Sequence, residues 1–268
     1  MHPRISVSAI CSFPWSLHED LDLWSALDVT NVGVSVAKLE RAGWDAGVAR
    51  VEEAGLHVAN LIGLGPFHLA EPAQWPRQRE RLTNALEAAD RLDAGCLVFT
   101  TGPSAALAWE DAAAALEQAL APVLEEAHAR GRAFAIEHTN PLRVDVGFVH
   151  TLRDDIDLAR RLGAGVCMEV NACWSERALD ATIRDGVDTL RLVQVSDFAS
   201  GTLSTPNRLV PGDGDIPLER IIGTVLDAGY TGCFDLELIG PRIDDEGYPS
   251  AIRRSVDWLT EVLTRLGV

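Results

Sequence analysis

The chain of 268 residues has no uninterrupted apolar run near the roughly 18 residues that a membrane-spanning helix needs. Its first residues lack the basic segment, apolar segment and small-residue cleavage site of a signal peptide, so we expect a cytoplasmic protein. Basic residues are also few. The 23 lysines and arginines face 40 acidic residues, which gives a formal net charge of −17. A field of this sign repels nucleic acids and anionic membranes, and we expect neither as a partner.

Several catalytic signatures are missing as well. The sequence contains no G-x-S-x-G motif, no Walker loop and no C-x-x-C motif. Its five cysteines are an odd number, and most lie inside strand-like runs, which favours buried thiols over a disulfide framework or a zinc cluster. Cys167 and Cys173 lie near Glu169, but no obvious histidine would activate them. These absences argue against an enzyme that uses a serine or cysteine nucleophile.

The sequence does contain a regular alternation of two patterns. Strand-like, apolar runs alternate eight times with segments of helical period, such as 109–130 and 250–266, without a linker-like gap. Hydrophobic residues make up 47% of the chain and its mean hydropathy is +0.06, which suits one well-cored domain over residues 1–268. The strand-like runs cover residues 4–10, 27–36, 57–63, 95–102, 132–139, 164–171, 189–197 and 232–240.

This alternation predicts a single (β/α)8 TIM barrel. Runs that are apolar throughout indicate parallel strands covered on both faces. A doubly wound open sheet is the rival, but it would carry a glycine-rich phosphate loop after the first strand. The segment after Ile10, CSFPWSLHED, contains no glycine. Ser16, with Glu19 three residues later, has the pattern of a helix capping box.

Four acidic or amide side chains end the last four strand-like runs: Glu137, Glu169, Gln194 and Glu237. The active site of a TIM barrel lies at the carboxyl ends of its strands, so these side chains should converge there. A buried carboxylate without a partner is costly, and converging carboxylates repel one another unless a cation lies between them. The pattern therefore predicts a divalent metal ion bound by these four residues.

Four segments resemble the xylose-isomerase-like TIM-barrel superfamily of sugar isomerases, epimerases and dehydratases. They are AIEHTNP, MEVNACW, LVQVSDF and PGDGDIPLERIIGTVLDAGYTGCFDLEL. Members of that family typically bind one divalent cation through Glu, Asp, His and Glu from strands five to eight. Glu137 and Glu237 match the outer two ligands, whereas Glu169 stands where Asp is usual and Gln194 where His is usual. A site made only of oxygen atoms suits Mn²⁺ or Mg²⁺ and disfavours Zn²⁺.

The resemblance implies that Glu137 and Glu237 move protons on either side of a bound sugar. We expect a metal-dependent isomerase or epimerase that acts on a keto-sugar or polyol-like hydroxy-carbonyl compound. A dehydratase or lyase, or a metal-free barrel serving as a binding module or partner subunit, stays open. Endonuclease IV-type DNA repair is excluded by the net charge and by seven scattered histidines. The family also implies a homodimer or homotetramer.

Several of these residues have a second interpretation. Glu137 and Glu237 could be carboxylates bound to arginines rather than an acid/base pair. Asn171 shares a face with Glu169 and could replace it as a ligand. The Gln194 amide could hydrogen-bond Glu169 or Glu237 without any metal. Asp197 could be a loop acid of the site or a cap for the next segment.

Strand alternation points His138 away from the barrel axis, where a neighbouring acid or the backbone would bind it. Arg208 lies in the long segment 199–214, where it could bind a substrate hydroxyl or phosphate. Tryptophan side chains that follow strands could stack on a sugar ring or pack in the core. The expected substrate-binding residues are His68, Trp174, Asn171, Arg208 and Trp15.

Overall fold

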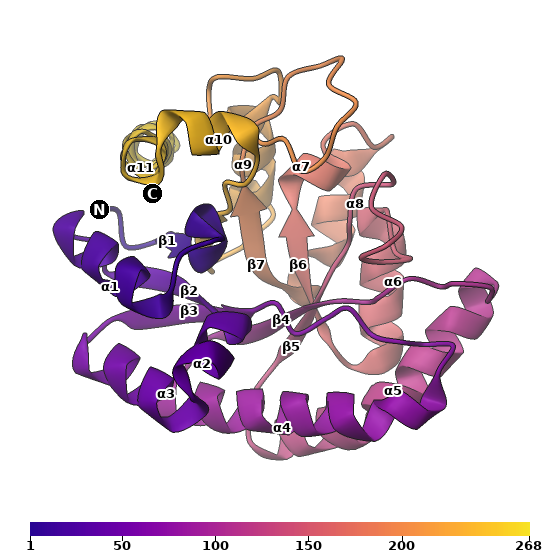
Figure 1. The fold of residues 1–268 in the computed structure, drawn as a ribbon. Coiled ribbons are helices and arrows are strands. Elements are labelled where there is room, and N and C mark those ends of the chain that lie inside the picture. Colours follow the sequence, from indigo (N-terminus) through magenta and orange to yellow (C-terminus); the bar gives the residue numbers. More distant parts are fainter.

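The computed structural model describes residues 1–268 and confirms the TIM barrel. Eight parallel strands close into a barrel in chain order, with β1 paired to β8 (Figure 1). Each strand lies inside one of the eight apolar runs identified in the sequence. The strands are β1 (Ile5–Ser8), β2 (Asn31–Ser35), β3 (His57–Ile62), β4 (Cys96–Thr100), β5 (Phe134–Glu137), β6 (Gly165–Glu169), β7 (Leu190–Val195) and β8 (Phe234–Leu236).

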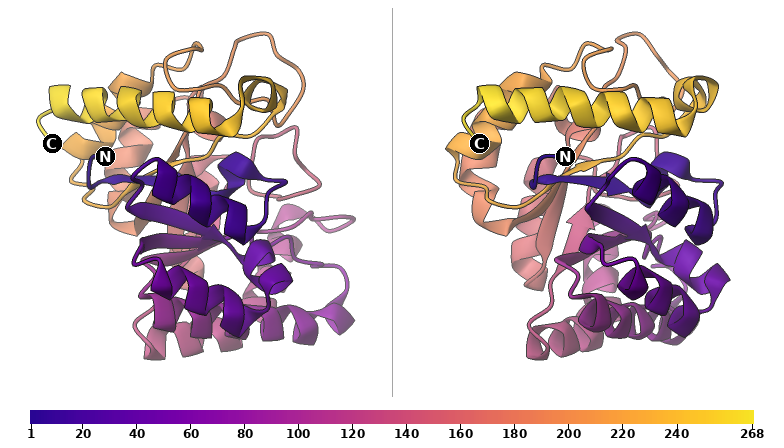
Figure 2. Two further views of the ribbon diagram at one scale, coloured as in Figure 1. Left: turned by 60° about the vertical axis from the view of Figure 1, so that its left-hand side comes forward. Right: turned by 90° about the vertical axis from the view of Figure 1, so that its left-hand side faces the viewer.

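Helices surround the barrel, and α11 lies across the side where β1 and β8 meet (Figures 1 and 2). The predicted helices 109–130 and 250–266 correspond to α5 and α11, and the capping box of Ser16 and Glu19 is formed at the start of α1. The helices are α1 (Leu17–Ala26), α2 (Val36–Ala42), α3 (Trp44–Glu53), α4 (Trp75–Leu92), α5 (Trp109–Ala129), α6 (Leu152–Leu162), α7 (Val170–Cys173), α8 (Leu179–Gly186), α9 (Leu218–Asp227), α10 (Pro241–Glu246) and α11 (Tyr248–Arg265), with short 3-10 helices η1 (Ala9–Ser12), η2 (Pro72–Gln74) and η3 (Val187–Thr189). None of the helices is both long and apolar enough to cross a membrane.

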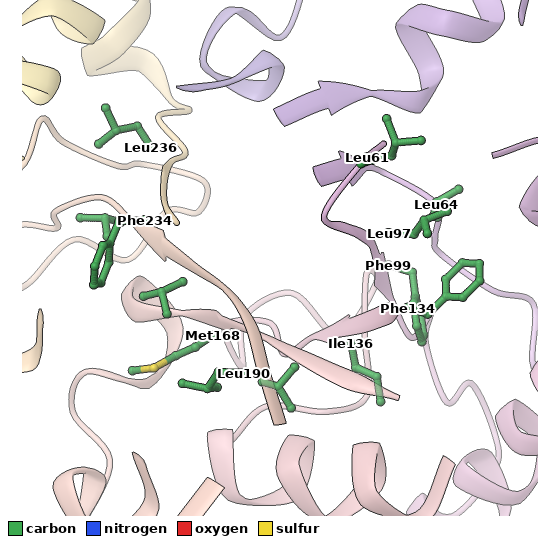
Figure 3. Packing of buried hydrophobic residues seen from close by; sticks show 14 of the residues in the cluster. Leu61, Leu64, Leu97, Phe99, Phe134, Ile136, Met168, Leu190, Phe234 and Leu236 are labelled. Carbon is green, nitrogen blue, oxygen red and sulfur yellow. The ribbon is translucent and has the colours of Figure 1, made fainter. Parts of the chain in front are cut away.

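The main hydrophobic core lies between the barrel and the helices. It contains 68 buried residues, and the close-up in Figure 3 shows strand residues such as Phe99, Phe134 and Met168 in it. Phe99 packs edge-on against both Phe67 and Phe134. This layer covers the outward face of the strands, and the barrel interior covers the other. Below the mouth, the inward face is apolar on β4, β5 and β6, whereas β1, β3 and β8 carry the buried polar residues Ser6, Asn60 and Asp235 there.

The barrel interior has its own small apolar layer. It consists of Ile62, Cys96, Val98, Ala135, Cys167 and Leu192. Side chains alternate between faces along a strand, so the residues two positions later on β5, β6 and β7 also point inward. These are Glu137, Glu169 and Gln194, one layer closer to the barrel mouth.

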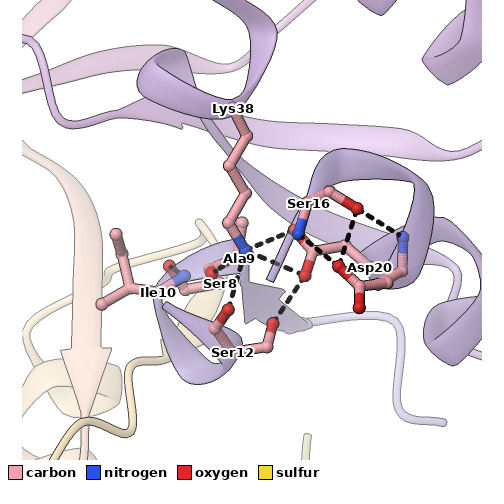
Figure 4. Close-up of polar contacts among 8 residues, drawn as sticks. Ser8, Ala9, Ile10, Ser12, Ser16, Asp20 and Lys38 are labelled. Carbon is pink, nitrogen blue, oxygen red and sulfur yellow. Dashed lines mark hydrogen bonds and ion pairs between the residues drawn. The ribbon is translucent and has the colours of Figure 1, made fainter. Parts of the chain in front are cut away.

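The only lysine of the chain, Lys38, is buried beside the mouth on α2. Figure 4 shows its ammonium group bound to Asp20 on α1 and to the backbone carbonyls of Ala9 and Ser12 in η1. The nitrogen lies 2.7 Å from Asp20 Oδ2, and the Ser12 hydroxyl donates to Asp20 Oδ1 at 2.6 Å. This buried ion pair fixes the segment that leads from β1 to α1.

Candidate metal and active site at the barrel mouth

Three carboxylates converge at the carboxyl ends of the strands. One oxygen each from Glu137, Glu169 and Glu237 lies within 4.8 Å of the others, and all three residues are buried. Glu137 and Glu169 end β5 and β6, and Glu237 directly follows β8. Gln194 on β7 is the register neighbour of Glu169. The structure therefore brings the four predicted ligands to one side of the mouth.

A guanidinium group supplies the positive charge among these carboxylates. Arg208 Nη1 lies 2.7 Å from Glu169 Oε2 and 3.3 Å from Glu237 Oε1, with 13% of its side chain exposed. It also donates to the backbone carbonyl of Glu237 at 2.9 Å. The sequence pattern predicts that Arg208 binds substrate, but it does not place the guanidinium between the glutamates. The chain itself thus provides a cation for two of the three carboxylates, Glu169 and Glu237.

The loop that delivers Arg208 is organised by Asp197. The two carboxylate oxygens of Asp197 accept backbone N–H groups from Phe198, Gly212, Gly214 and Ile216. Four backbone donors converging on one buried carboxylate fix both ends of the segment. Asp197 is therefore a cap, which is one of the two roles that its position in the sequence allows. The Arg208 backbone N–H also bonds to the carbonyl of Ile239, at 3.0 Å.

The glutamates differ in how many partners they have. Glu169 uses both oxygens, because Oε1 accepts the Asn171 backbone N–H at 2.8 Å and Oε2 contacts Arg208. Glu237 contacts Arg208 through Oε1 and accepts the side-chain amide of Gln194 through Oε2. Glu137 makes no side-chain hydrogen bond or ion pair and faces the cavity. Its carboxyl group is therefore free to exchange a proton with a bound molecule.

Burial and mutual repulsion change the proton affinities of these groups. Burial, and then the nearby Glu237 and Glu169 carboxylates, raise the pKa of Glu137 well above its usual value. Burial raises the pKa of Glu237 to about 7, although Arg208 opposes the shift. For Arg208, burial works against the charge, but the three carboxylates outweigh it and raise the pKa above its usual range. Glu137 therefore binds a proton more tightly than an exposed glutamate does, and Glu237 is poised to gain or lose one near neutral pH.

The donor set fits a divalent metal ion. Glu137, Glu169 and Glu237 offer carboxylate oxygens within 4.8 Å of one another. The amide oxygen of Gln194 is buried and has no hydrogen-bond partner, which leaves it available as a fourth ligand. The Gln194 amide nitrogen donates to Glu237, as the metal-free interpretation of this residue expects, while its amide oxygen stays free for a metal ion. All four donors are oxygen atoms, the type that Mg²⁺, Mn²⁺ and Ca²⁺ prefer.

A cavity of about 390 Å³ opens at the mouth beside these residues. It is lined by Glu137, Glu169, Glu237, Arg208 and Asn171, and by apolar side chains from several loops. This volume lies within the usual range of small-molecule sites, which is about 300–1,000 Å³. The lining also includes residues that the sequence pattern did not indicate, among them Phe13 and Arg143. Phe13, 56% exposed, directly follows η1, and Arg143 follows β5; only their positions after strands could have indicated them.

Three of the expected substrate-binding residues lie outside the lining of this cavity. His68 is half exposed, pairs with Glu71 and faces a separate groove along α4. Trp15 packs edge-on against Tyr248 with ring centroids 5.1 Å apart. Trp174 packs against the hydrophobic core. Asn171 and Arg208 do line the cavity, so the structure brings only these two of the five together with the glutamates.

His138 points away from the barrel axis, as strand alternation predicts. Its Nδ1 hydrogen-bonds Asp155 on α6 at 3.0 Å, and both side chains are fully buried. Burial alone would lower the pKa of His138, but the Asp155 hydrogen bond raises it well above its usual value. The expectation that Cys173 lacks a histidine was wrong, since His138 lies against its thiol. The two residues are 35 positions apart, so sequence proximity gave no sign of the contact.

Fold and site together define a TIM barrel with a cluster of buried carboxylates at its mouth. The sequence matches the family described as xylose isomerase-like TIM barrel over residues 23–262. The chain belongs to this family.

Known proteins of similar sequence or structure include an isomerase and an epimerase. An inosose isomerase of Halalkalibacterium halodurans is 24% identical over 124 residues, which is 44% of each chain, so the match spans less than half of that protein. The structure of IolI with a bound zinc atom superposes with a TM-score of 0.84 at 14% identity, covering 98% of this chain and 99% of that one. The 3-keto-D-glucoside 4-epimerase YcjR of E. coli gives 0.74 at 18% identity, covering 96% and 99%. At such identities, the structural matches establish the fold.

Proposed function

We propose that this protein is a divalent-metal-dependent isomerase or epimerase of a keto-sugar or polyol-like hydroxy-carbonyl compound. The observation that carries the proposal is the pair Glu137 and Glu237. Their carboxylate oxygens lie within 4.8 Å of each other, both line one cavity, and the pKa of each is raised. The family membership and the named activities of the two relatives, an isomerase and an epimerase, support the same class of reaction.

The reaction needs a base beside a C–H bond that a neighbouring carbonyl makes acidic. Glu237, with a pKa of about 7, is suited to remove that proton at neutral pH. Glu137, whose pKa is raised well above its usual value and whose carboxyl group has no side-chain partner, is suited to deliver one to the adjacent atom or to the opposite face. Two carboxyl groups with different environments can thus act as base and acid in one turnover.

The remaining groups bind and stabilise the substrate. Arg208 lines the cavity beside both glutamates, so its guanidinium can stabilise negative charge that develops on a substrate oxygen. A divalent ion held by Glu137, Glu169, Gln194 and Glu237 would supply further positive charge beside the carbonyl. We propose Mn²⁺ or Mg²⁺ for this ion, because every donor is an oxygen atom. Phe13 offers an exposed ring at the cavity on which the C–H face of a sugar could stack.

A second candidate is a metal-free barrel that binds a small molecule without converting it. Arg208 favours this candidate, because its guanidinium already compensates two of the three carboxylates. A dehydratase or lyase would begin with the same proton removal and end with loss of water or carbon–carbon cleavage. Proton exchange between substrate and solvent separates the binding module from all the enzymes.

The experiment is proton NMR in deuterium oxide with Mn²⁺, on a panel of keto-inositols, ketoses and 3-keto-glycosides. We expect one class of compound to lose the signal of the hydrogen next to its carbonyl. Glu137→Gln and Glu237→Gln should each slow this exchange at least about 100-fold, which is typical for removing an acid/base group. Glu71→Gln, an exposed carboxylate outside the cavity, is the matched control and should exchange at the original rate.

If both cavity variants keep the original exchange rate, the proton-transfer role is wrong. New signals of an unsaturated product would identify the dehydratase instead. Binding by calorimetry without any exchange would identify the binding module.

A further inference from the structure

A second cluster of metal-ligating side chains lies on the outer side of β5, away from the barrel axis. The His138 imidazole, the Cys173 thiol and the Glu176 carboxylate each offer a ligand atom within 4.8 Å of the others. His138 directly follows β5, Cys173 ends α7, and Glu176 lies in the turn beyond it. His138 and Cys173 are fully buried, whereas Glu176 is half-buried. The cluster thus joins three segments and reaches solvent on one side.

The imidazole of His138 is oriented by a hydrogen bond at only one of its two ring nitrogens. Its Nδ1 is occupied by the hydrogen bond to Asp155 Oδ2, so Nε2 is the nitrogen that remains for another partner. Nε2 is buried and has no oxygen or nitrogen partner, an unusual state for a buried polar atom, and the group that lies beside it is the Cys173 thiol. A carboxylate behind the far nitrogen of a histidine is the arrangement that orients metal-bound histidines.

We propose that His138 Nε2, Cys173 Sγ and Glu176 bind a divalent ion of borderline softness such as Zn²⁺. Nitrogen, sulfur and oxygen donors together match the ligand types of Zn²⁺ and differ from the oxygen-only set at the mouth. Glu176 Oε1 accepts the backbone N–H of Leu152 at 2.8 Å, which leaves Oε2 for the ion. Three protein ligands leave a fourth, tetrahedral position for water on the half-buried side of Glu176.

The ion would connect the end of β5 to α7 and to the turn after it, and hydrogen bonds of His138 and Glu176 link the same site to α6. Glu137 is the residue before His138, so this site supports the strand end that carries a carboxylate of the mouth. The competing arrangement is a direct contact between the Cys173 thiol and Nε2 without an ion. The two arrangements differ in whether the sulfur is bonded to a metal, which a spectroscopic probe can detect.

The probe is Co²⁺, added to the reduced protein both in its native state and during refolding, so that a closed entry path cannot hide the site. Thiolate ligation produces an intense near-ultraviolet charge-transfer band, which oxygen ligands do not. We expect this band in the unmodified protein and in the double variant Glu169→Gln/Glu237→Gln, which disables the mouth. Cys173→Ser should abolish it, and Glu176→Gln should weaken Co²⁺ binding at least about tenfold. Cys233→Ser, at a cysteine outside the cluster, should keep it.

The proposal is overturned if the unmodified protein gives no charge-transfer band under either condition. It is equally overturned if the band survives in a Cys173→Ser protein that circular dichroism shows to be folded, or if it disappears in the mouth variant. None of these results bears on the proton-exchange assay, because the two sites have no ligand in common. Failure here therefore leaves the proposed reaction at the mouth intact.

Discussion

Arg208 reduces the electrostatic repulsion among the three glutamates at the mouth. Its Nη1 lies 2.7 Å from Glu169 and 3.3 Å from Glu237, close enough for strong attraction in a site with little water. A metal ion that uses the same oxygens must displace this nitrogen, because Glu169 Oε1 is already bonded to the backbone N–H of Asn171. The guanidinium and a divalent ion therefore compete for Glu169.

This competition predicts the behaviour of Arg208→Gln. Without the guanidinium, we expect the Kd for Mn²⁺ to fall at least about tenfold, since one competing cation is gone and the carboxylates are less compensated. In the absence of metal, the same variant should unfold more easily, by about 3 kcal/mol, because it leaves buried carboxylates without their partner. Isothermal calorimetry gives the affinity, and urea unfolding with and without Mn²⁺ gives the stability.

Arg143→Gln is the matched control for this prediction. Arg143 also lines the cavity, but it pairs with Asp145 and contacts none of the glutamates. Its Kd for Mn²⁺ should stay within about twofold, as for a distant and screened charge. Equal metal affinity in the Arg208 variant and the original protein would show that the two cations occupy separate places.

Among the elements, the segment between β1 and α1 depends on a buried ion pair. Lys38 on α2 holds Asp20 on α1 and two carbonyls of η1. Burial raises the pKa of Asp20 to about 6, and the nearby Lys38 opposes this shift. Burial lowers the pKa of Lys38, and the nearby Asp20 opposes that shift. Phe13, which lines the cavity, directly follows η1, so this pair also fixes one wall of the site.

The raised pKa of Asp20 gives a pH dependence with a defined sign. The folded state binds this proton more tightly than the unfolded chain, so stability falls as the pH rises from about 3.9 towards the folded pKa. Lys38→Met removes the compensating cation and raises that pKa further, which extends the loss to higher pH. We expect Lys38→Met to be nearly as stable as the original protein at pH 5 and about 3 kcal/mol less stable at pH 8. Urea unfolding at both pH values measures this.

Arg41→Met is the control that shows whether loss of any cation from α2, rather than of the buried Lys38, lowers the stability. Arg41 is exposed and lies three residues after Lys38 on the same helix. Its replacement should change stability by less than about 0.5 kcal/mol at either pH. A Lys38 variant with the same deficit at pH 5 and pH 8 would contradict the role assigned to Asp20.

The elements also show what could be predicted from the sequence. Strand alternation is a local property, so the amino-acid pattern alone predicts Glu137 inside the barrel and His138 outside it. The position of Arg208 was not accessible in this way. It depends on a loop without periodicity, whose path is set by Asp197 binding backbone groups up to 19 residues away. For the same reason the sequence indicated Trp15 and gave no sign of Phe13, because side-chain direction in a turn follows no repeat.

For the whole molecule, the two ends of the barrel differ in structure. The cavity and the glutamates lie at the carboxyl ends of the strands, and the opposite ends carry short connections. The first and last segments of the chain lie close together, with His2 Nε2 3.1 Å from the carbonyl oxygen of Val268 (Figures 1 and 2). The pairing of β1 with β8 closes the barrel between them.

This arrangement predicts that the chain tolerates circular permutation on the face opposite the site. Met1 and Val268 would be joined by a short glycine linker, and the chain opened between Arg130 and Gly131, which are exposed and connect α5 to β5. We expect the permuted protein to keep its barrel and its Mn²⁺ affinity, with a Tm within about 5 °C, because the cut removes few contacts. Calorimetry and thermal unfolding provide both readouts.

A second permutant, with the chain opened at Leu203, separates the folding of the barrel from metal binding at its mouth. Leu203 is 87% exposed in the loop that carries Arg208, so a cut there should also allow folding. The barrel closes through β1 and β8 in either permutant, but this cut frees one end of the segment that carries Arg208, which is then held by its backbone bond to Ile239 and by the pairing of Leu209 with Asp197. The Leu203 permutant should therefore keep a cooperative thermal transition and bind Mn²⁺ more tightly than the original protein, but less tightly than Arg208→Gln. A barrel that fails to fold when opened at Arg130 would show that the α5–β5 connection helps to hold the strands together.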